Sequence, residues 1–306
     1  MTHRWTRGER FPIPDADGLD EMCDAKLPRV LLGEGERPDA LDAPRIAIVG
    51  TRAATPLGIA DAYEIATFCA RAGITVISGL ALGIDAAAHE GALDAGGLTV
   101  GVVATGLDVV YPLRHRQLYE RVREQGLILT EHPPGTQPLP WRFPFRNRII
   151  AALADGVLVV EAARKGGAIS TANHAVRFNR ELFVLPGSRR NPAAAGCNLL
   201  LRDGAHPLLE PSDLLGAIGL AGTLECPWKT ATKTARRPRP AGRAAGHEWR
   251  GGERRRAPAA DRISPRPVGS GVAHARTSRA RRPATRPVLA FLIQGVSEVV
   301  DQNSWN

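Results

Sequence analysis

The sequence predicts an α/β protein with a doubly wound, mostly parallel sheet and helices on both faces. Three observations lead to this prediction. Short runs of uniformly apolar residues recur between residues 45 and 220, as in strands that are buried on both sides. Helical stretches separate these runs, and glycine closes several of the stretches. Alternating strands and helices give right-handed crossovers and a parallel sheet.

The elements are expected in a regular order. Six strands are predicted at residues 46–49, 74–78, 98–104, 127–130, 157–161 and 182–185. Five helices are predicted at residues 56–72, 84–95, 114–125, 146–154 and 168–179. Gly73, Gly96 and Gly126 follow the first three helices, and each is expected to adopt the left-handed conformation that ends a helix.

The positive charge of the chain is unevenly distributed. The 306 residues carry a net charge of +9, yet residues 229–286 hold 17 Lys and Arg against three acidic side chains. Residues 1–228 hold 23 basic against 26 acidic side chains. Residues 223–306 are expected to form a disordered tail because Arg, Pro, Ala and Gly dominate most of them without apolar periodicity. Such a tail is either a nonspecific nucleic-acid tether or a solvated, accidental extension, for instance from a shifted reading frame.

Cysteine spacing and apolar patterns indicate the cellular setting. Cys23, Cys69, Cys197 and Cys226 form no C-x-x-C pair, so reduced thiols are expected rather than zinc ligands or a disulfide framework. No apolar run approaches the roughly 18 residues of a membrane span, and the first residues lack the apolar segment of a secretion signal. We therefore expect a cytoplasmic protein with no membrane partner.

Glycines, aromatic side chains and cations cluster directly after the predicted strands. Ligands of doubly wound sheets bind outside the carboxyl ends of the strands. Glycine lets a backbone approach a ligand closely, and free N–H groups at a helix start favour phosphate. The residues concerned are Gly50, Thr51, Arg52, Gly79, Gly83, Phe143, Phe145, Arg146, Asn147, Arg148, Arg164, Lys165, Gly166 and Gly167. The sequence thus predicts a basic, phosphate-binding pocket on an otherwise slightly acidic body.

The two closely spaced arginines of this edge allow more than one arrangement. Arg146 and Arg148 lie two residues apart at a helix start, so they do not share one helical face. One of them is expected in the pocket while the other pairs elsewhere, for instance with Glu161 or Asp155. The neighbouring Phe143 and Phe145 are either core residues or rings for base stacking.

Other residues at this edge also have simpler interpretations. Asp85 and His89 stand at helical spacing, which suits a metal or acid–base pair but more often a helix cap and a helix surface. Each glycine after a strand can equally be a plain turn residue.

Common catalytic motifs are missing from the sequence. Gly50 and Gly58 fit neither G-x-G-x-x-G nor the phosphate loop that ends in G-K-[ST], and Ser78 does not stand in G-x-S-x-G. No Ser, His and Asp set and no carboxylate pair can be assembled from motifs. We expect no cofactor, no metal and no enzymatic activity.

Seven segments together resemble the DNA-processing protein A (DprA/Smf) family of bacterial transformation. They are IAIVGTR (46–52), ISGLALGIDAAAH (77–89), GVVATGLDVVYP (101–112), FPFRNRII (143–150), VLVVEAARKGGAISTANHA (157–175), VLPGS (184–188) and GCNLLLRDGA (196–205). They follow one another in order over most of residues 45–210. The resemblance implies a Rossmann-like domain at residues 45–222 that binds single-stranded DNA in a basic pocket, forms a homodimer and loads the RecA recombinase.

The resemblance also implies roles for individual positions. The turn of Gly50, Thr51 and Arg52 would hold phosphate, with Arg52 as its strongest member. Gly79 and Gly83 would let a loop approach the DNA backbone. The remaining residues would line the pocket or close its far side: Phe143, Phe145, Arg146, Asn147 and Arg148 in the first group, and Lys165, Gly166 and Gly167 in the second.

Three departures from the family pattern are visible. The Lys165 loop differs from the S-G-S pattern that many members carry. Residues 1–44 would be a remnant of the family's helical module or a linker, and the basic tail stands where a winged-helix module is expected. An alternative is a related Rossmann-like phosphoribohydrolase acting on nucleoside monophosphates. Its P-G-G-x-G-T-x-x-E pattern is not matched, since Asn173 and His174 stand where an acidic base is needed.

Overall fold

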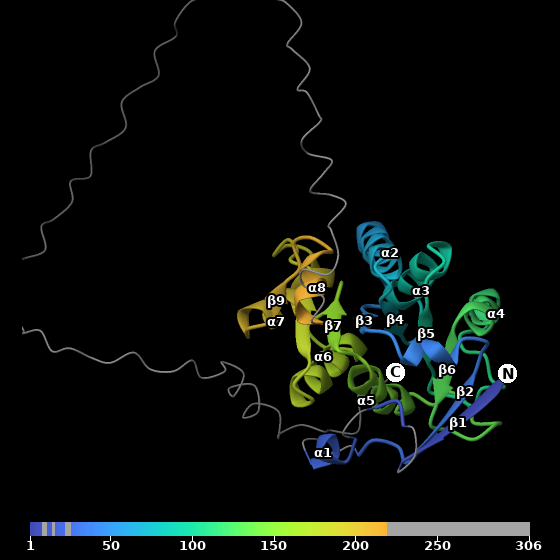
Figure 1. The fold of residues 1–306 in the computed structure, drawn as a ribbon. Helices are drawn as coiled ribbons and strands as arrows, with labels where there is room; N and C mark the ends of the chain where they lie inside the picture. Colours follow the sequence, from blue (N-terminus) through green and yellow to red (C-terminus); the bar gives the residue numbers. More distant parts are fainter. Residues whose placement is uncertain (8–10, 14–15, 22–25, 219–306) are drawn as a thin grey trace, which may run out of the picture. The chain divides into compact units, whose positions relative to one another are not determined.

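The computed structural model describes residues 1–7, 11–13, 16–21 and 26–218 (Figure 1). The strands are β1 (Thr2–Thr6), β2 (Val30–Glu34), β3 (Arg45–Val49), β4 (Thr75–Ser78), β5 (Thr99–Val102), β6 (Leu127–Thr130), β7 (Gly156–Val159), β8 (Glu181–Val184) and β9 (His206–Pro207). The α-helices are α1 (Ala16–Glu21), α2 (Pro56–Arg71), α3 (Ile84–Asp94), α4 (Arg116–Gln125), α5 (Arg142–Leu153), α6 (Gly167–Arg177), α7 (Ala195–Arg202) and α8 (Asp213–Ala217). Short 3-10 helices are η1 (Pro38–Leu41), η2 (Leu113–His115) and η3 (Pro192–Ala194). The predicted disordered tail lies outside the described residues.

The nine strands form one sheet in the order β1-β2-β6-β5-β4-β3-β7-β8-β9. In the part of this order that runs from β6 to β9, all neighbouring strands are parallel. Strand β2 pairs antiparallel with both of its neighbours, β1 and β6. This confirms the predicted doubly wound fold and all six predicted strands. Strands β3, β4, β5 and β6 follow one another in the same direction across the sheet. The next strand, β7, lies on the other side of β3. The strand order therefore reverses between β3 and β7, where such folds bind their ligands.

Helices cover both faces of the sheet. Helices α2, α3 and α4 lie on one side and α5 and α6 on the other (Figure 1). Along β3, Ile46 and Ile48 pack with the α2 and α3 side chains, while Ala47 and Val49 pack with those of α5 and α6. Every residue of β3 is buried, so the uniformly apolar run that predicted a two-sided strand is explained. Among the described residues, no helix is long and apolar enough to cross a membrane.

The N-terminal segment contributes two strands to the sheet. Strand β2 pairs with β6, with Leu32 opposite Thr130, and β1 pairs along the outer side of β2. Leu31 of β2 is fully buried and Trp5 of β1 packs against the same core. The described part of residues 1–44 widens the sheet by these two strands and also contains the short helices α1 and η1. The origin of this segment as a helical remnant or linker stays a prediction.

Two of the three predicted glycine helix stops are confirmed. Gly73 and Gly96 both have φ of 73°, the left-handed conformation that ends α2 and α3. The prediction for Gly126 is wrong, because its φ is −156°. Gly126 is required for another reason: a Cβ there would overlap the main-chain oxygen of Thr99 on the neighbouring strand.

Candidate functional site

The loops at the carboxyl ends of β3, β4 and β7 are joined by main-chain hydrogen bonds. The N–H of Thr51 donates to the carbonyl of Glu161 at 2.8 Å, and the N–H of Ile84 donates to the carbonyl of Thr51 at 3.4 Å. Gly83 has φ of 78°, and a Cβ there would overlap the oxygen of Thr51. These contacts make one continuous edge from three segments that are far apart in the sequence.

A buried carboxylate occupies the anion position at the start of α2. Glu161 accepts hydrogen bonds from the Thr55 N–H (2.9 Å) and the Thr55 hydroxyl (2.6 Å). Thr55 also caps α2 by accepting from the Gly58 N–H at 3.0 Å. The protein therefore supplies its own negative charge at the positive end of α2, where a phosphate group could otherwise bind.

Helix α6 begins differently, because no side chain caps it. Its N-cap residue, Gly166, has φ of 148° and provides no side-chain acceptor. The residues before and at the helix start are exposed: Arg164, Lys165, Gly166 and Gly167. A helix start with free N–H groups beside two cations is suited to bind an anion.

Arg52 stacks on an aromatic pair at the same edge. Its guanidinium carbon lies 4.9 Å from the centre of the Phe143 ring, and the Phe143 and Tyr111 ring centres are 5.5 Å apart. The three side chains come from the loops after β3 and β5 and from the first turn of α5. Arg52 and Tyr111 are exposed and Phe143 is half-buried. The structure thus brings Arg52 and Phe143 together, as the pocket prediction requires.

Arg146 lies inside the protein. It is 4% exposed, and its guanidinium donates to the carbonyls of Gly79 (2.7 Å) and Val102. Burial lowers its pKa, and the buried carboxylate of Asp85 opposes that change. These bonds tie the ends of β4 and β5 to α5. The phosphate contact expected of Arg146 stays a prediction.

Arg148 is also buried, at 5% exposure, and forms a two-pronged ion pair with Glu131 at 2.8 and 2.7 Å. Its Nε donates to the carbonyl of Lys26. The suggested partners, Glu161 and Asp155, are therefore wrong for Arg148. Sequence spacing indicated that the two arginines diverge, but the structure directs both of them inward to separate acceptors.

The remaining predicted positions serve the packing of this edge. A Cβ on Gly79 would come within 2.6 Å of Arg146 Nη1 and of Asp85 Oδ2, and a Cβ on Gly50 would overlap Ile84. These close neighbours are protein atoms, so the approach of DNA to both glycines stays a prediction. The Asn147 amide donates to the carbonyl of Gly167 at 3.0 Å and joins α5 to the start of α6.

Asp85 and His89 point into the protein and do not form a metal pair. Asp85 accepts from the Gly79 N–H at 3.2 Å, and burial raises its pKa. His89 is fully buried with Nδ1 2.7 Å from the hydroxyl of Thr99, which itself donates to the carbonyl of Val76. His89 must therefore donate from Nδ1, and its Nε2 has no partner. Among the described residues, no His, Cys, Asp and Glu group is placed to hold a metal ion.

The neutral His89 predicts a loss of stability in acid. Burial lowers its pKa from 6.5 to about 3. Between pH 6.5 and 3 the unfolded chain binds a proton at His89 that the folded chain does not. The stability that the neutral His89 contributes is therefore fully present above pH 6.5 and is lost as the pH falls toward 3. In urea unfolding, His89→Gln should reduce the pH slope of the unfolding free energy in this range by about 1.4 kcal/mol per pH unit. An unchanged slope would show that His89 is not held neutral.

The structure adds exposed groups that were not predicted as site residues. Tyr111 and Trp141 lie beside Phe143 and Phe145, and Arg189 and Arg190 follow β8 at the same edge. A usable signal was present, because each lies in a loop that follows a predicted strand. It was overlooked because single aromatic residues in proline-containing loops have no fixed spacing.

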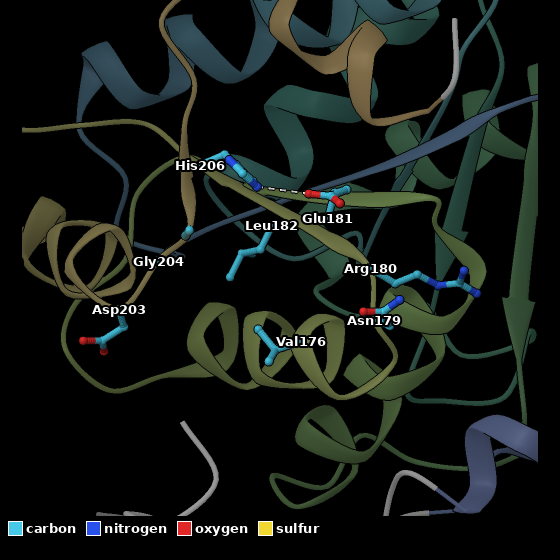
Figure 2. A pocket seen from close by; sticks show the side chains of 9 residues that line it. Val176, Asn179, Arg180, Glu181, Leu182, Asp203, Gly204 and His206 are labelled. Atoms are coloured by element: carbon cyan, nitrogen blue, oxygen red, sulfur yellow. Dashed lines mark ion pairs between the residues drawn. The ribbon is translucent and has the colours of Figure 1, made fainter. Parts of the chain in front are cut away.

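A hollow lies at the opposite edge of the sheet, where β8 and β9 begin (Figure 2). Its lining residues are Val176, Asn179, Arg180, Glu181, Leu182, Asp203, Gly204, Ala205 and His206. His206 and Glu181 form an ion pair at 3.1 Å, and both are exposed. Two exposed, paired charges offer little binding energy, so this hollow is a weaker candidate than the carboxyl edge.

Comparison with known families agrees with this geometry. Residues 11–219 match the family of the DNA recombination-mediator protein A. The chain belongs to this family. It is 44% identical over 182 residues to Protein Smf of Synechocystis, covering 60% of this chain and 46% of that protein. Matches span about half of the length of the first curated relatives, between 46% and 60%.

Two solved structures of family members share the fold. The X-ray structure of DNA processing protein A from Streptococcus pneumoniae is 36% identical with a TM-score of 0.64, covering 70% of this chain and 73% of that one. DNA processing protein A from Helicobacter pylori, whose structure describes a single-stranded DNA binding mode, is 31% identical with a TM-score of 0.60. That match covers 70% of this chain and 94% of the Helicobacter chain. The family match at residues 11–219 includes all the loops of the edge described above.

Proposed function

We propose that this recombination-mediator family member binds single-stranded DNA at the carboxyl edge of its sheet. The observation that carries the proposal is the exposed Arg52 guanidinium stacked 4.9 Å from the Phe143 ring centre, beside Tyr111. A guanidinium binds a phosphate, and an adjacent ring offers its face to an unpaired base. The Helicobacter relative's binding of single-stranded DNA supports this choice of ligand.

The remaining cations of the edge extend this surface along the sheet. The loops after β3, β7 and β8 follow neighbouring strands, and they carry Arg52, then Arg164 and Lys165, then Arg189 and Arg190. The uncapped start of α6 lies in the middle of this series. A phosphate backbone crossing the strand ends would meet a cation at each loop.

Recombinase loading and dimer formation complete the proposal as expectations from the family resemblance. The cytoplasmic location is an expectation from the cysteine spacing and the apolar patterns. In this account the chain holds single-stranded DNA for RecA as a homodimer and performs no reaction on it. The phosphoribohydrolase alternative requires an anion-binding turn with an acidic base. Both Glu161 and Asp85 are buried at this edge and already engaged, Glu161 by Thr55 and Asp85 by the Gly79 N–H.

Binding should therefore discriminate between single and double strands. We expect the full chain to bind a labelled single-stranded oligonucleotide at least ten times more tightly than the same sequence as a duplex, because paired bases cannot stack on Phe143. Fluorescence anisotropy at moderate salt measures both affinities. Equal affinities would contradict the proposal, and release of adenine from AMP in the same preparation would favour the enzyme instead.

A further inference from the structure

A second aromatic pair lies at the start of α5 and takes no part in the Arg52 cluster. Trp141 and Phe145 are 56% and 49% exposed, which is unusual for such large apolar side chains. Their ring centres are 6.0 Å apart in an edge-to-face arrangement. They stand four residues apart, so they share one side of the helix.

Cations accompany both rings of this pair. The guanidinium carbon of Arg142 lies 5.1 Å from the centre of the Trp141 ring, and that of Arg148 lies 5.8 Å from the Phe145 ring. Arg142 donates to the carbonyl of Gln137, and Arg148 is held by Glu131. The Arg148 charge is balanced by Glu131, so Arg142 is the cation that accompanies this pair, as Arg52 accompanies the Phe143 ring.

The position of the pair relative to Phe143 follows from helix geometry. Phe143 is two residues from each partner, which is about 200° around the helix axis. Trp141 and Phe145 thus lie on the other side of the first turn of α5 from the Arg52, Tyr111 and Phe143 cluster. A helix with side chains is about 10 to 12 Å across, a distance that a few nucleotides of a single strand can span.

We propose that Trp141 and Phe145 form a second base-stacking step, occupied by a base a few nucleotides away from the one at Phe143. This inference rests on the proposed function. A nucleotide satisfies both features of the patch, because its base stacks on a ring while its phosphate faces a guanidinium. An apolar protein surface would instead have to strip water from the Arg142 charge without pairing it.

The test compares oligonucleotide length with the full chain. For the double variant Trp141→Ala/Phe145→Ala, we expect at least a fivefold loss of affinity for long single strands. Strands too short to reach from Phe143 to Trp141 and Phe145 should bind with unchanged affinity. Leu57→Ala is the matched control, since Leu57 is a 70% exposed apolar residue in the first turn of α2. A Trp141→Phe chain should bind long strands more tightly than a Trp141→Ala chain and about as tightly as the original chain, because a ring is enough for stacking. Equal unfolding temperatures show that the variants remain folded.

The outcomes separate this inference from the function on which it rests. Suppose that the double variant binds oligonucleotides of every length as tightly as the original chain, while binding still depends on Arg52. The second stacking site at Trp141 and Phe145 is then wrong, and the site at Arg52 and Phe143 stands. If the original chain binds no single-stranded DNA, the proposed function fails first and the inference fails with it. Trp141 also gives a direct signal: its fluorescence should be quenched by long strands, and a Trp141→Phe chain should lose that quenching.

Discussion

Arg52→Glu is expected to lower the affinity for single-stranded DNA by about 10- to 100-fold at moderate salt. The change removes a charge-assisted phosphate contact and places a negative charge on the Phe143 ring, where the guanidinium now lies 4.9 Å from the ring centre. A loss of this size corresponds to roughly 1.4 to 2.7 kcal/mol of binding free energy. Because Arg52 is exposed, the free energy of unfolding should change by less than about 0.5 kcal/mol.

Arg71→Glu is the matched control for this substitution. Arg71 is exposed in the last turn of α2, at the opposite end of the helix from the candidate site, and its reversal changes the net charge by the same amount. Its affinity should stay within about twofold of the original chain at moderate salt. Equal losses for both variants would mean that binding follows net charge rather than the Arg52 cluster.

Arg146→Met is expected to destabilise the fold rather than to weaken a phosphate contact. The substitution leaves the buried carbonyls of Gly79 and Val102 without their donor and leaves the Asp85 carboxylate without its neighbouring positive charge. Breaking a buried charge arrangement of this kind costs about 3 to 5 kcal/mol. Urea unfolding measures the loss directly.

Two further variants make this prediction specific. Arg164→Met removes an exposed arginine of the same edge and should change the unfolding free energy by less than about 0.5 kcal/mol. Asp85→Asn combined with Arg146→Met should recover part of the loss, because no buried carboxylate then remains unpaired. If Arg146→Met is as stable as the original chain but binds DNA poorly, Arg146 is a phosphate ligand as the family resemblance implied.

The fold was largely predictable because its strands carry a local signal. Residues buried on both faces give uniformly apolar runs, and the run at residues 46–49 became β3, buried along its whole length. Strands β1 and β2 were not predicted, because β2 is stabilised by pairing with β6 about 100 residues away and β1 in turn pairs only with β2. A half-exposed strand such as Thr2–Thr6, which contains His3 and Arg4, has no comparable pattern.

The candidate site was predictable only in part, and the reason is visible in its arginines. Sequence shows where positive charge lies but not which acceptors surround it. Arg146 is bound by main-chain carbonyls, which have no signature in the sequence. Arg148 is bound by Glu131, and the sequence does not distinguish this partner from other acidic residues. Arg52 could be chosen as a candidate because it follows a strand directly and has no acidic residue close to it in sequence, and its exposure in the structure agrees with that choice.

Hydrogen–deuterium exchange of the full chain, with and without a single-stranded oligonucleotide, shows where the DNA lies. If DNA binds at the carboxyl edge, exchange should slow in residues 50–55, 141–146 and 163–168, which contain the Arg52 loop, the start of α5 and the start of α6. Exchange around Asn179 and His206, at the opposite edge, should not change. Protection confined to that opposite edge, or none in the three loops while DNA is bound, would contradict the account.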